Sequence, residues 1–400
     1  MYKNTLVCGA ALACLVPSSF VMAQGNMSPA ISLVLQGQYA DFSQDPEAYE
    51  LPGFMLGGEA GLHAAGFGLG HGELVMSSTI DDLYFGKLTL AIADHEGETE
   101  VELEEAYIET LGLGSGFTIK AGRYFSSLGY LNSQHIHAWD FVDAPLVYRA
   151  LFGNQLIDDG LQLRWLAPTD LFFQVGLEAG RGERFPAGGA AKDGNGSLTA
   201  FAEIGGDVGD SHSWQAGFSH WSADVVGRAS GSHAHGGGTE IPTFTGDSDV
   251  SAIDMVWKWA PKGNVSERNL TLQFEYFLRN EKGSVDMVGS TSLETTTYDG
   301  EQRGWYGQAV YQFMHGWSAG LRYDRLDADN LGSDQEVLAE AGLDNEGHTP
   351  QRTSIMIDYA RSEFSLIRLQ FNRDESYEHS DNQIFVQYVV SMGAHGAHQF

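Results

Sequence analysis

Paired histidines are the residues of this 400-residue chain whose spacing points most directly to chemistry. The chain contains 14 histidines, and two pairs, His135 with His137 and His233 with His235, are separated by a single residue. The second pair lies in a glycine-rich stretch, and His95 is followed by acidic residues. Imidazole and carboxylate groups together suit Zn²⁺ and related divalent ions, and glycine-rich linkers let such ligands converge. The sequence therefore predicts metal binding at these five histidines.

The alternative is that these histidines are solvated and bind nothing. A pair of imidazoles does not complete a tetrahedral zinc site, which needs a third and a fourth ligand. Sequence spacing does not locate those ligands. We expect the remaining histidines outside the last strand to be structural or to lie on the surface: His63, His71, His212, His220, His315, His348 and His379.

The elements that must hold these residues are β-strands, because from residue 30 onward the polarity of the chain alternates with a period of two. In 270–276, for example, apolar residues alternate with Thr271, Gln273 and Glu275. Segments of about ten residues with this pattern are typical of a transmembrane β-barrel, apolar toward lipid and polar toward the lumen. Sixteen such segments are predicted, near 31–41, 70–80, 83–94, 101–111, 117–124, 158–167, 171–180, 198–206, 213–222, 250–260, 268–279, 303–313, 316–325, 352–361, 364–373 and 383–400.

The connections between these segments favour the barrel over its main alternative, a soluble β-sandwich. Links after even-numbered segments are short, whereas most links after odd-numbered ones are long, as periplasmic turns and outer loops of a barrel must be. A sandwich has no reason to separate its loops in this way. The fold class predicted is therefore all-β, a porin-like antiparallel barrel of about 16 strands, in which the long segment 125–157 folds inward as a constriction loop.

Composition and the N-terminal residues indicate where such a barrel would lie. Acidic residues outnumber basic ones 53 to 22, giving a formal charge of −31, which excludes a basic surface for nucleic acid. No apolar stretch of about 18 residues suggests a transmembrane helix. Residues 1–23 have the pattern of a secretory signal, with Lys3, an apolar stretch and a small-residue cleavage site. Both cysteines, Cys8 and Cys14, lie inside it, so we expect residues 24–400 to form a disulfide-free barrel exported through the periplasm.

Three blocks and the chain ending carry a resemblance to a known family. Residues 122–125 and 135–145, then 158–170 and the ending 393–400, resemble proteobacterial outer-membrane proteins described as zinc-regulated, TonB-dependent receptors. The layout is also similar to that of phosphate-selective porins. The resemblance implies a bacterial outer-membrane location and a link to zinc. TonB-dependent receptors need a plug domain and a much larger barrel than 24–400 would hold, so we carry over only the location and the zinc link.

Charged residues suggest how a pore would select solutes. A loop that narrows a pore sets its selectivity by the charges that it presents. The loop and the strand after it carry Asp140, Asp143, Arg149, Asp158 and Asp159, and other strands carry Arg123, Arg164, Arg322 and Arg368. We interpret Asp140 and Asp143 with these four strand arginines as pore-lining, with acids facing arginines across the lumen. The alternative is that the charges pair with one another for stability.

These observations predict a porin-like channel for small solutes that takes part in uptake of zinc or another divalent metal. The alternatives are a metal-capturing surface receptor that depends on an energised partner, and an outer-membrane hydrolase. We expect no catalytic site and no cofactor, apart from Zn²⁺ as a transported or bound ion. The partners expected are outer-membrane lipid and lipopolysaccharide, the barrel-assembly machinery through the terminal Phe400, small solutes, and two further copies in a homotrimer.

Overall fold

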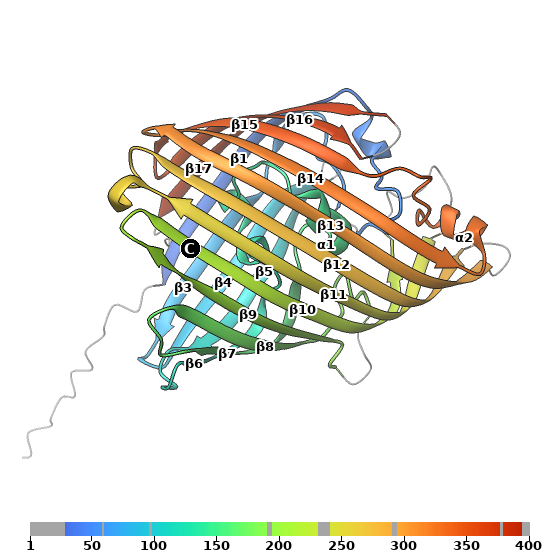
Figure 1. The fold of residues 1–400 in the computed structure, drawn as a ribbon, viewed down its shortest axis with the longest axis horizontal. Helices are drawn as coiled ribbons and strands as arrows, with labels where there is room; N and C mark the ends of the chain where they lie inside the picture. Colours follow the sequence, from blue (N-terminus) through green and yellow to red (C-terminus); the bar gives the residue numbers. More distant parts are fainter. Residues whose placement is uncertain are drawn as a thin grey trace, which may run out of the picture.

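The computed structural model describes residues 29–57, 60–95, 98–189, 194–230, 241–289, 294–376 and 379–393, which form one antiparallel sheet closed into a barrel (Figure 1). Closure is made by β1 and β17, which pair from Ser32 with Gly393 to Phe42 with Gln383. The strands of the described residues are β1 (Ala30–Phe42), β2 (Gly66–Leu69), β3 (Gly72–Ile80), β4 (Tyr84–His95), β5 (Glu98–Thr110), β6 (Phe117–Phe125), β7 (Ile157–Leu166), β8 (Phe172–Gly180), β9 (Ser197–Val208), β10 (His212–Ala229), β11 (Ile241–Trp259), β12 (Asn269–Val288), β13 (Glu294–Met314), β14 (Trp317–Gly332), β15 (Gln351–Ser362), β16 (Ser365–Glu375) and β17 (Asp381–Gly393). Because β2 and β3 both pair with β1, they form one wall strand, and the barrel has the predicted 16 strands.

The alternation of polarity explains why these segments form a barrel wall. Along β12, Leu272 and Phe274 are exposed on the outer face, while Gln273 and Glu275 are buried on the inner face. Apolar side chains thus face lipid and polar ones face the lumen, as the period of two predicts. No helix in the described parts of the chain is long and apolar enough to cross a membrane.

Strands β10 to β14 extend beyond the predicted boundaries, so much of the expected loops 223–249 and 280–302 is strand, as is the beginning of 326–351, up to Gly332. The reason is that the alternation continues but changes sign. In the outer part of β12, Asn280 and Lys282 are exposed, whereas Val285 and Met287 are buried inside. Beyond the band of outward-facing apolar residues, called here the apolar belt, the outside of the wall is polar and its inside packs against protein. A search for outward-facing apolar residues therefore misses this outer part of the strands.

The segment 126–156 folds into the barrel, as predicted, and joins β6 to β7. It contains two short 3₁₀ turns (Leu131–Ser133 and Ile136–Ala138) and α1 (Leu146–Phe152). The helix α1 ends at Gly153, whose φ of 63° is left-handed and therefore suits a residue without a Cβ. In Figure 1, α1 is seen inside the barrel behind β12 and β13, whereas α2 (Gln335–Glu340) lies at the far end of the long strands.

An apolar core inside the barrel holds this loop in place. On α1, Tyr148 and Phe152 pack against Phe277 of β12, with ring centroids 5.2 and 5.5 Å apart. The connection between β1 and β2 also packs there through Tyr49 and Leu51. At the level of α1, the side of the lumen formed by β10 to β14 is therefore filled by packed side chains.

Candidate metal centre

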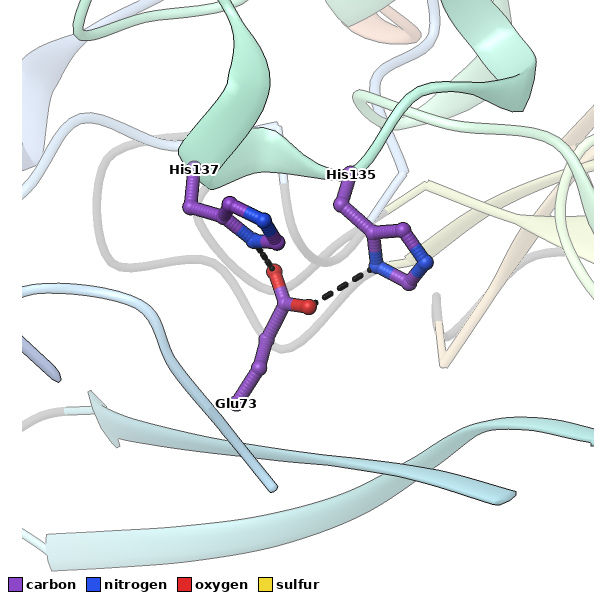
Figure 2. Close-up of side chains that lie close together, drawn as sticks. All are labelled: Glu73, His135 and His137. Atoms are coloured by element: carbon purple, nitrogen blue, oxygen red, sulfur yellow. Dashed lines mark hydrogen bonds and ion pairs between the residues drawn. The ribbon is translucent and has the colours of Figure 1, made fainter. Parts of the chain in front are cut away.

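Two histidines of the inner loop face the opposite side of the wall. His135 immediately precedes the 3₁₀ turn Ile136–Ala138, and His137 lies within it. Their rings are stacked with centroids 5.6 Å apart, and both point toward Glu73 of β3 (Figure 2). The His-x-His spacing thus places two imidazoles on one side of a tight turn.

A bulge in the wall supplies the first partners of these histidines. Gly37 of β1 pairs with Leu69, whereas Val34 pairs with Glu73, so two residues of β1 face the three residues 70–72. An extra residue of this kind re-aims side chains locally. It leaves His71 partly buried in contact with Glu73, whose side chain is fully buried.

A second bulge, in β5, brings two adjacent acids to the same place. Thr89 pairs with Glu105 and Leu90 with Leu103, so Glu104 is the extra residue. Neighbouring residues of a regular strand point to opposite faces, but at this bulge Glu104 and Glu105 both contact His135.

The resulting cluster is compact. The two carboxylate oxygens of Glu73 lie 2.8 Å from His135 Nδ1 and 2.8 Å from His137 Nδ1. His71 Nε2 lies 3.0 Å from Glu104 Oε1 and 3.6 Å from Glu73 Oε1. Glu73 is therefore shared by two overlapping sets of three ligands, one with His135 and His137 and the other with His71 and Glu104.

The arrangement fits a divalent ion. Within each set, the ligand atoms all lie within 4.8 Å of one another. This is slightly more than the about 4.2 Å that two ligands at about 2.1 Å from one zinc ion can span, so a bound ion would draw the ligands together by up to about 0.6 Å. Several contacts are short but are not aligned as hydrogen bonds: His71 Nε2, Glu73 Oε2, Glu104 Oε2 and His135 Nδ1 have no hydrogen-bond partner. Imidazole and carboxylate ligands in this number suit zinc and its first-row neighbours rather than calcium or magnesium. An ion would be held either by Glu73, His135 and His137 or by His71, Glu73 and Glu104.

Glu105 orients His135 from the far side of its ring. Its Oε2 atom lies 2.9 Å from His135 Nε2, and it is held by Lys87 at 2.6 Å and by the Thr89 hydroxyl at 2.9 Å. Metal-bound histidines commonly donate their other ring N–H to a carboxylate in this way. Lys87 Nζ also lies 2.8 Å from His135 Nε2, so this nitrogen contacts both Glu105 and Lys87. Glu105 therefore leaves Nδ1 of His135 directed toward Glu73.

The charge of His135 is set by the same carboxylates. Burial alone would lower the pKa of His135, but Glu73 and Glu105 outweigh it and raise that pKa to about 10. A metal ion binding at Nδ1 must therefore displace a proton, which makes binding dependent on pH.

The sequence identified only part of this cluster. His135 and His137, which the sequence singled out, lie in it, and their metal binding stays a prediction. His71 was expected to be structural or on the surface, yet it contacts both Glu73 and Glu104. Residues 231–240, and with them His233 and His235, lie outside the described residues, as does the side chain of His95. Glu73 and Glu105 gave no sequence signal, because strand bulges decide where they point and period-two alternation does not reveal bulges.

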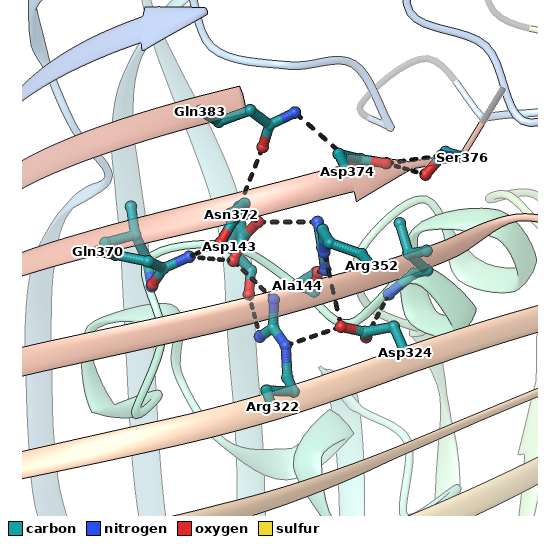
Figure 3. Close-up of polar contacts among 12 residues, drawn as sticks. Asp143, Ala144, Arg322, Asp324, Arg352, Gln370, Asn372, Asp374, Ser376 and Gln383 are labelled. Carbon is teal, nitrogen blue, oxygen red and sulfur yellow. Dashed lines mark hydrogen bonds and ion pairs between the residues drawn. The ribbon is translucent and has the colours of Figure 1, made fainter. Parts of the chain in front are cut away.

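A second polar cluster fastens the other end of the inner loop (Figure 3). Asp143 accepts hydrogen bonds from Arg322 of β14 at 2.7 Å, Arg352 of β15 at 2.8 Å, and Gln370 and Asn372 of β16 at 2.8 and 2.9 Å. All these side chains are buried. Burial alone would raise the pKa of Asp143, but the Arg352 and Arg322 guanidiniums hold it well below its usual range. Asp143 thus stays ionised and anchors the loop.

Further contacts attach the loop to other parts of the wall. Backbone amides of Tyr130 and Leu131 donate to Glu275 of β12, and the amide of Ser127 donates to Glu178 of β8. Gln308 of β13 donates to Asp140 at 2.8 Å. With the clusters around Glu73 and Asp143, the loop is bonded to strands on several sides of the barrel.

Five of the six predicted pore-lining charges are paired with an opposite charge at contact distance, instead of facing one another across the lumen. The sixth, Asp140, accepts the hydrogen bond from Gln308. Arg322 contacts Asp143 itself, which corrects the expectation that the two lie on opposite sides. The remaining pairs are Arg123 with Asp159 at 2.6 Å, Arg164 with Glu109 at 2.6 Å and Arg368 with Asp358 at 3.5 Å. Asp158 accepts from Gly182 and Ser197, and buried Arg149 stacks on Tyr49. The charges of Arg123, Arg164, Arg322 and Arg368 are thus compensated locally, and a role in lining a pore stays a prediction.

Comparison of the sequence with known proteins gives one informative relative. No family model matches the chain. A protein of Aquifex aeolicus, described as uncharacterized, is 30% identical to this chain over an alignment 406 residues long, which covers 94% of this chain and 81% of that one. The two chains belong to one family. This kinship extends over nearly the whole barrel.

Solved structures of similar shape are outer-membrane proteins. The outer-membrane channel DcaP of Acinetobacter baumannii has a TM-score of 0.54 at 14% identity, covering 91% of this chain and 97% of that one. An anion-selective porin of Comamonas acidovorans has a TM-score of 0.53 at 11% identity, covering 91% and 99%. OmpT of Vibrio cholerae in a trimer form has a TM-score of 0.50 at 10% identity, covering 91% and 99%. At these identities the likeness shows the fold, a porin-like barrel.

Proposed function

We propose that this protein is an outer-membrane channel for small solutes that takes part in the uptake of zinc or a similar divalent metal ion. The observation that carries the metal part is the buried cluster of His71, Glu73, Glu104, His135 and His137, in which wall and loop ligands meet. The ion is cargo in this proposal, and the cluster is a binding step on its way through the barrel.

The channel part is supported by the architecture. A loop folded into a 16-stranded barrel is the arrangement by which such proteins set pore size and selectivity. The inner face also carries many polar side chains, among them Gln273, Gln308 and Gln387. Outer-membrane location is supported by the outward apolar belt and by the outer-membrane barrels with similar folds.

Metal uptake is tested by loading vesicles. Refolded protein in lipid vesicles should admit Zn²⁺ to an internal zinc-sensitive dye faster than empty vesicles do. We expect the double variant His135→Ala, His137→Ala to bind zinc weakly in calorimetry and to lose the zinc preference, while still admitting a neutral sugar. His348→Ala is the matched control, because His348 bonds the Glu375 carbonyl and lies outside the cluster. Equal zinc entry through the double variant and wild type would refute the role of the cluster.

A receptor that depends on an energised partner is the second candidate. It is favoured by the many bonds between the inner loop and the wall, from Glu178 through Glu275 to Asp143. Single-channel recording distinguishes the two: discrete conductance steps support a channel, whereas tight zinc binding without steps supports the receptor.

The remaining expectations belong to the same proposal. A homotrimer is supported by the trimer form of the similarly folded OmpT, and cross-linking in detergent tests it. Assembly through Phe400 and export by residues 1–23 concern parts of the chain outside the described residues. A non-enzymatic role is supported by the porin-like folds and is tested by an esterase assay on the folded barrel.

A further inference from the structure

The metal cluster is built from two separate parts of the molecule. His135 and His137 belong to the inner loop, whereas His71, Glu73 and Glu104 belong to the wall strands β3 and β5 and the bulge before β3. An ion that binds ligands from both parts stabilises only the arrangement in which they touch.

The other end of the loop is attached by groups that do not depend on a metal. Asp143 is bound by Arg322 and Arg352, and guanidinium groups stay charged at all physiological pH values. The amides of Val142 and Leu146 donate to Gln370 and Asp324 of the wall. A metal ion in the cluster would therefore attach the segment around His135 and His137 to the wall directly, whereas it would have no direct contact with the 142–146 segment.

We propose that a divalent ion bound at this cluster acts as a removable clamp between the inner loop and the β3–β5 wall, so that metal occupancy regulates loop movement and the current through the barrel. This inference rests on the metal binding proposed above and adds a regulatory consequence to it. The ion that is taken up would thereby restrict its own passage when it is abundant.

The size of the effect follows from linkage. An ion that binds the joined state alone, present at 100 times its Kd, shifts the ratio of joined to separated loop about 100-fold. Amide exchange reports this ratio, because Ala138 and Trp139 donate to His135 and Ile136 within the turn. We therefore expect zinc to slow their exchange up to about 100-fold relative to EDTA.

The experiment is hydrogen exchange with mass spectrometry on the refolded full barrel, with ZnCl₂ or EDTA, alongside single-channel recording. Exchange of Ala138 and Trp139 should slow with zinc, and current fluctuations should fall. Exchange of Val142 and Leu146 should stay the same, which serves as an internal control. Glu73→Gln should abolish both zinc effects, and Glu109→Gln, on the same wall, should retain them. His137→Gln, a change confined to the loop, repeats the test without altering a wall strand.

Calorimetry on the same samples separates this inference from the proposed function. Zinc that binds wild type without slowing Ala138 and Trp139 overturns the clamp and leaves metal binding intact. Zinc that fails to bind overturns both. An equal effect of zinc on wild type and Glu73→Gln places its action elsewhere and overturns the clamp. Slowed exchange with unchanged current overturns the regulation of passage.

Discussion

Replacing Asp143 by alanine should release the inner loop from the wall. The carboxylate accepts four hydrogen bonds from Arg322, Arg352, Gln370 and Asn372, and both arginines are buried with it. Removing one partner of a buried ion pair costs about 3–5 kcal/mol, because the remaining charge is left uncompensated. Asp324 still contacts Arg322 at 3.1 Å and Arg352 at 3.5 Å, so we expect the lower end, about 3 kcal/mol.

This cost becomes a measurable exchange rate. Since each 1.4 kcal/mol is a factor of ten, 3 kcal/mol raises the population of released loop about 100-fold. Hydrogen exchange of Val142 and Leu146, whose amides bond wall side chains, should accelerate by that factor in Asp143→Ala. Asp143→Asn, which keeps the size but loses the charge, should fall between alanine and wild type.

A surface ion pair provides the control. Asp299 lies 3.9 Å from Lys282, and both side chains are more than two-thirds exposed, so Asp299→Ala should cost less than about 1 kcal/mol. Exchange of Val142 and Leu146 within threefold of wild type in a folded Asp143→Ala barrel would show that the buried pairs do not hold the loop.

Three further predictions concern acid, metal affinity and packing. Because the pKa of Asp143 is lowered in the folded protein, the stability that its carboxylate contributes is fully present above the unfolded pKa of about 3.9 and is lost as the pH falls through the lower folded pKa. Cleavage of 126–156 by pepsin, normalised to an unfolded substrate, should therefore rise only below about pH 4. Glu105→Gln should weaken zinc binding about 10- to 100-fold in calorimetry, whereas an equal Kd to that of Glu109→Gln would exclude an orienting role. Gly304→Ala should lower the free energy of chemical unfolding by about 1–3 kcal/mol, because the added Cβ would lie 2.7 Å from Val147 Cγ2 of α1 and 2.5 Å from Leu326 Cδ2. Gly307→Ala is the control, because its added Cβ would have its nearest neighbour at 3.8 Å and should change little. Equal effects of the two substitutions would contradict the packing argument.

The wall of the barrel was predictable because one physical rule governs it. A strand between lipid and a wet lumen must alternate, and segments such as 268–279 therefore stand out in the sequence. The rule no longer applies above the belt, where Lys282 faces out and Val285 packs inside. The outer halves of β10 to β14 were missed for this reason.

The candidate metal site was predictable only from the loop side. Histidine type and spacing identified His135 and His137, but their partners depend on two bulges. The extra residue Glu104 in β5 and the extra residue beside His71 turn side chains toward the histidines that regular strands would point to opposite faces. Register is a property of paired strands, so a single strand's sequence does not contain it. Charge pairing was the alternative that the sequence left open, but the partners of Arg322 and Arg352 could not be identified, because these ion pairs join residues far apart in the chain.

The unequal strand lengths make the wall around one opening of the barrel taller on one side than on the other. Strands β11 to β13 have 19 to 21 residues, whereas β6 to β8 have 9 or 10. One side of the barrel therefore extends further than the other, toward the α2 end in Figure 1. In the channel proposed above, a solute that approaches this end from the side would be blocked by the tall strands and would reach the opening over the short ones. The histidine-bearing turn faces away from the tall strands, toward β3 and β5. Shortening β11 to β13 would thus open a second direction of approach to the proposed channel while leaving the candidate metal ligands in place.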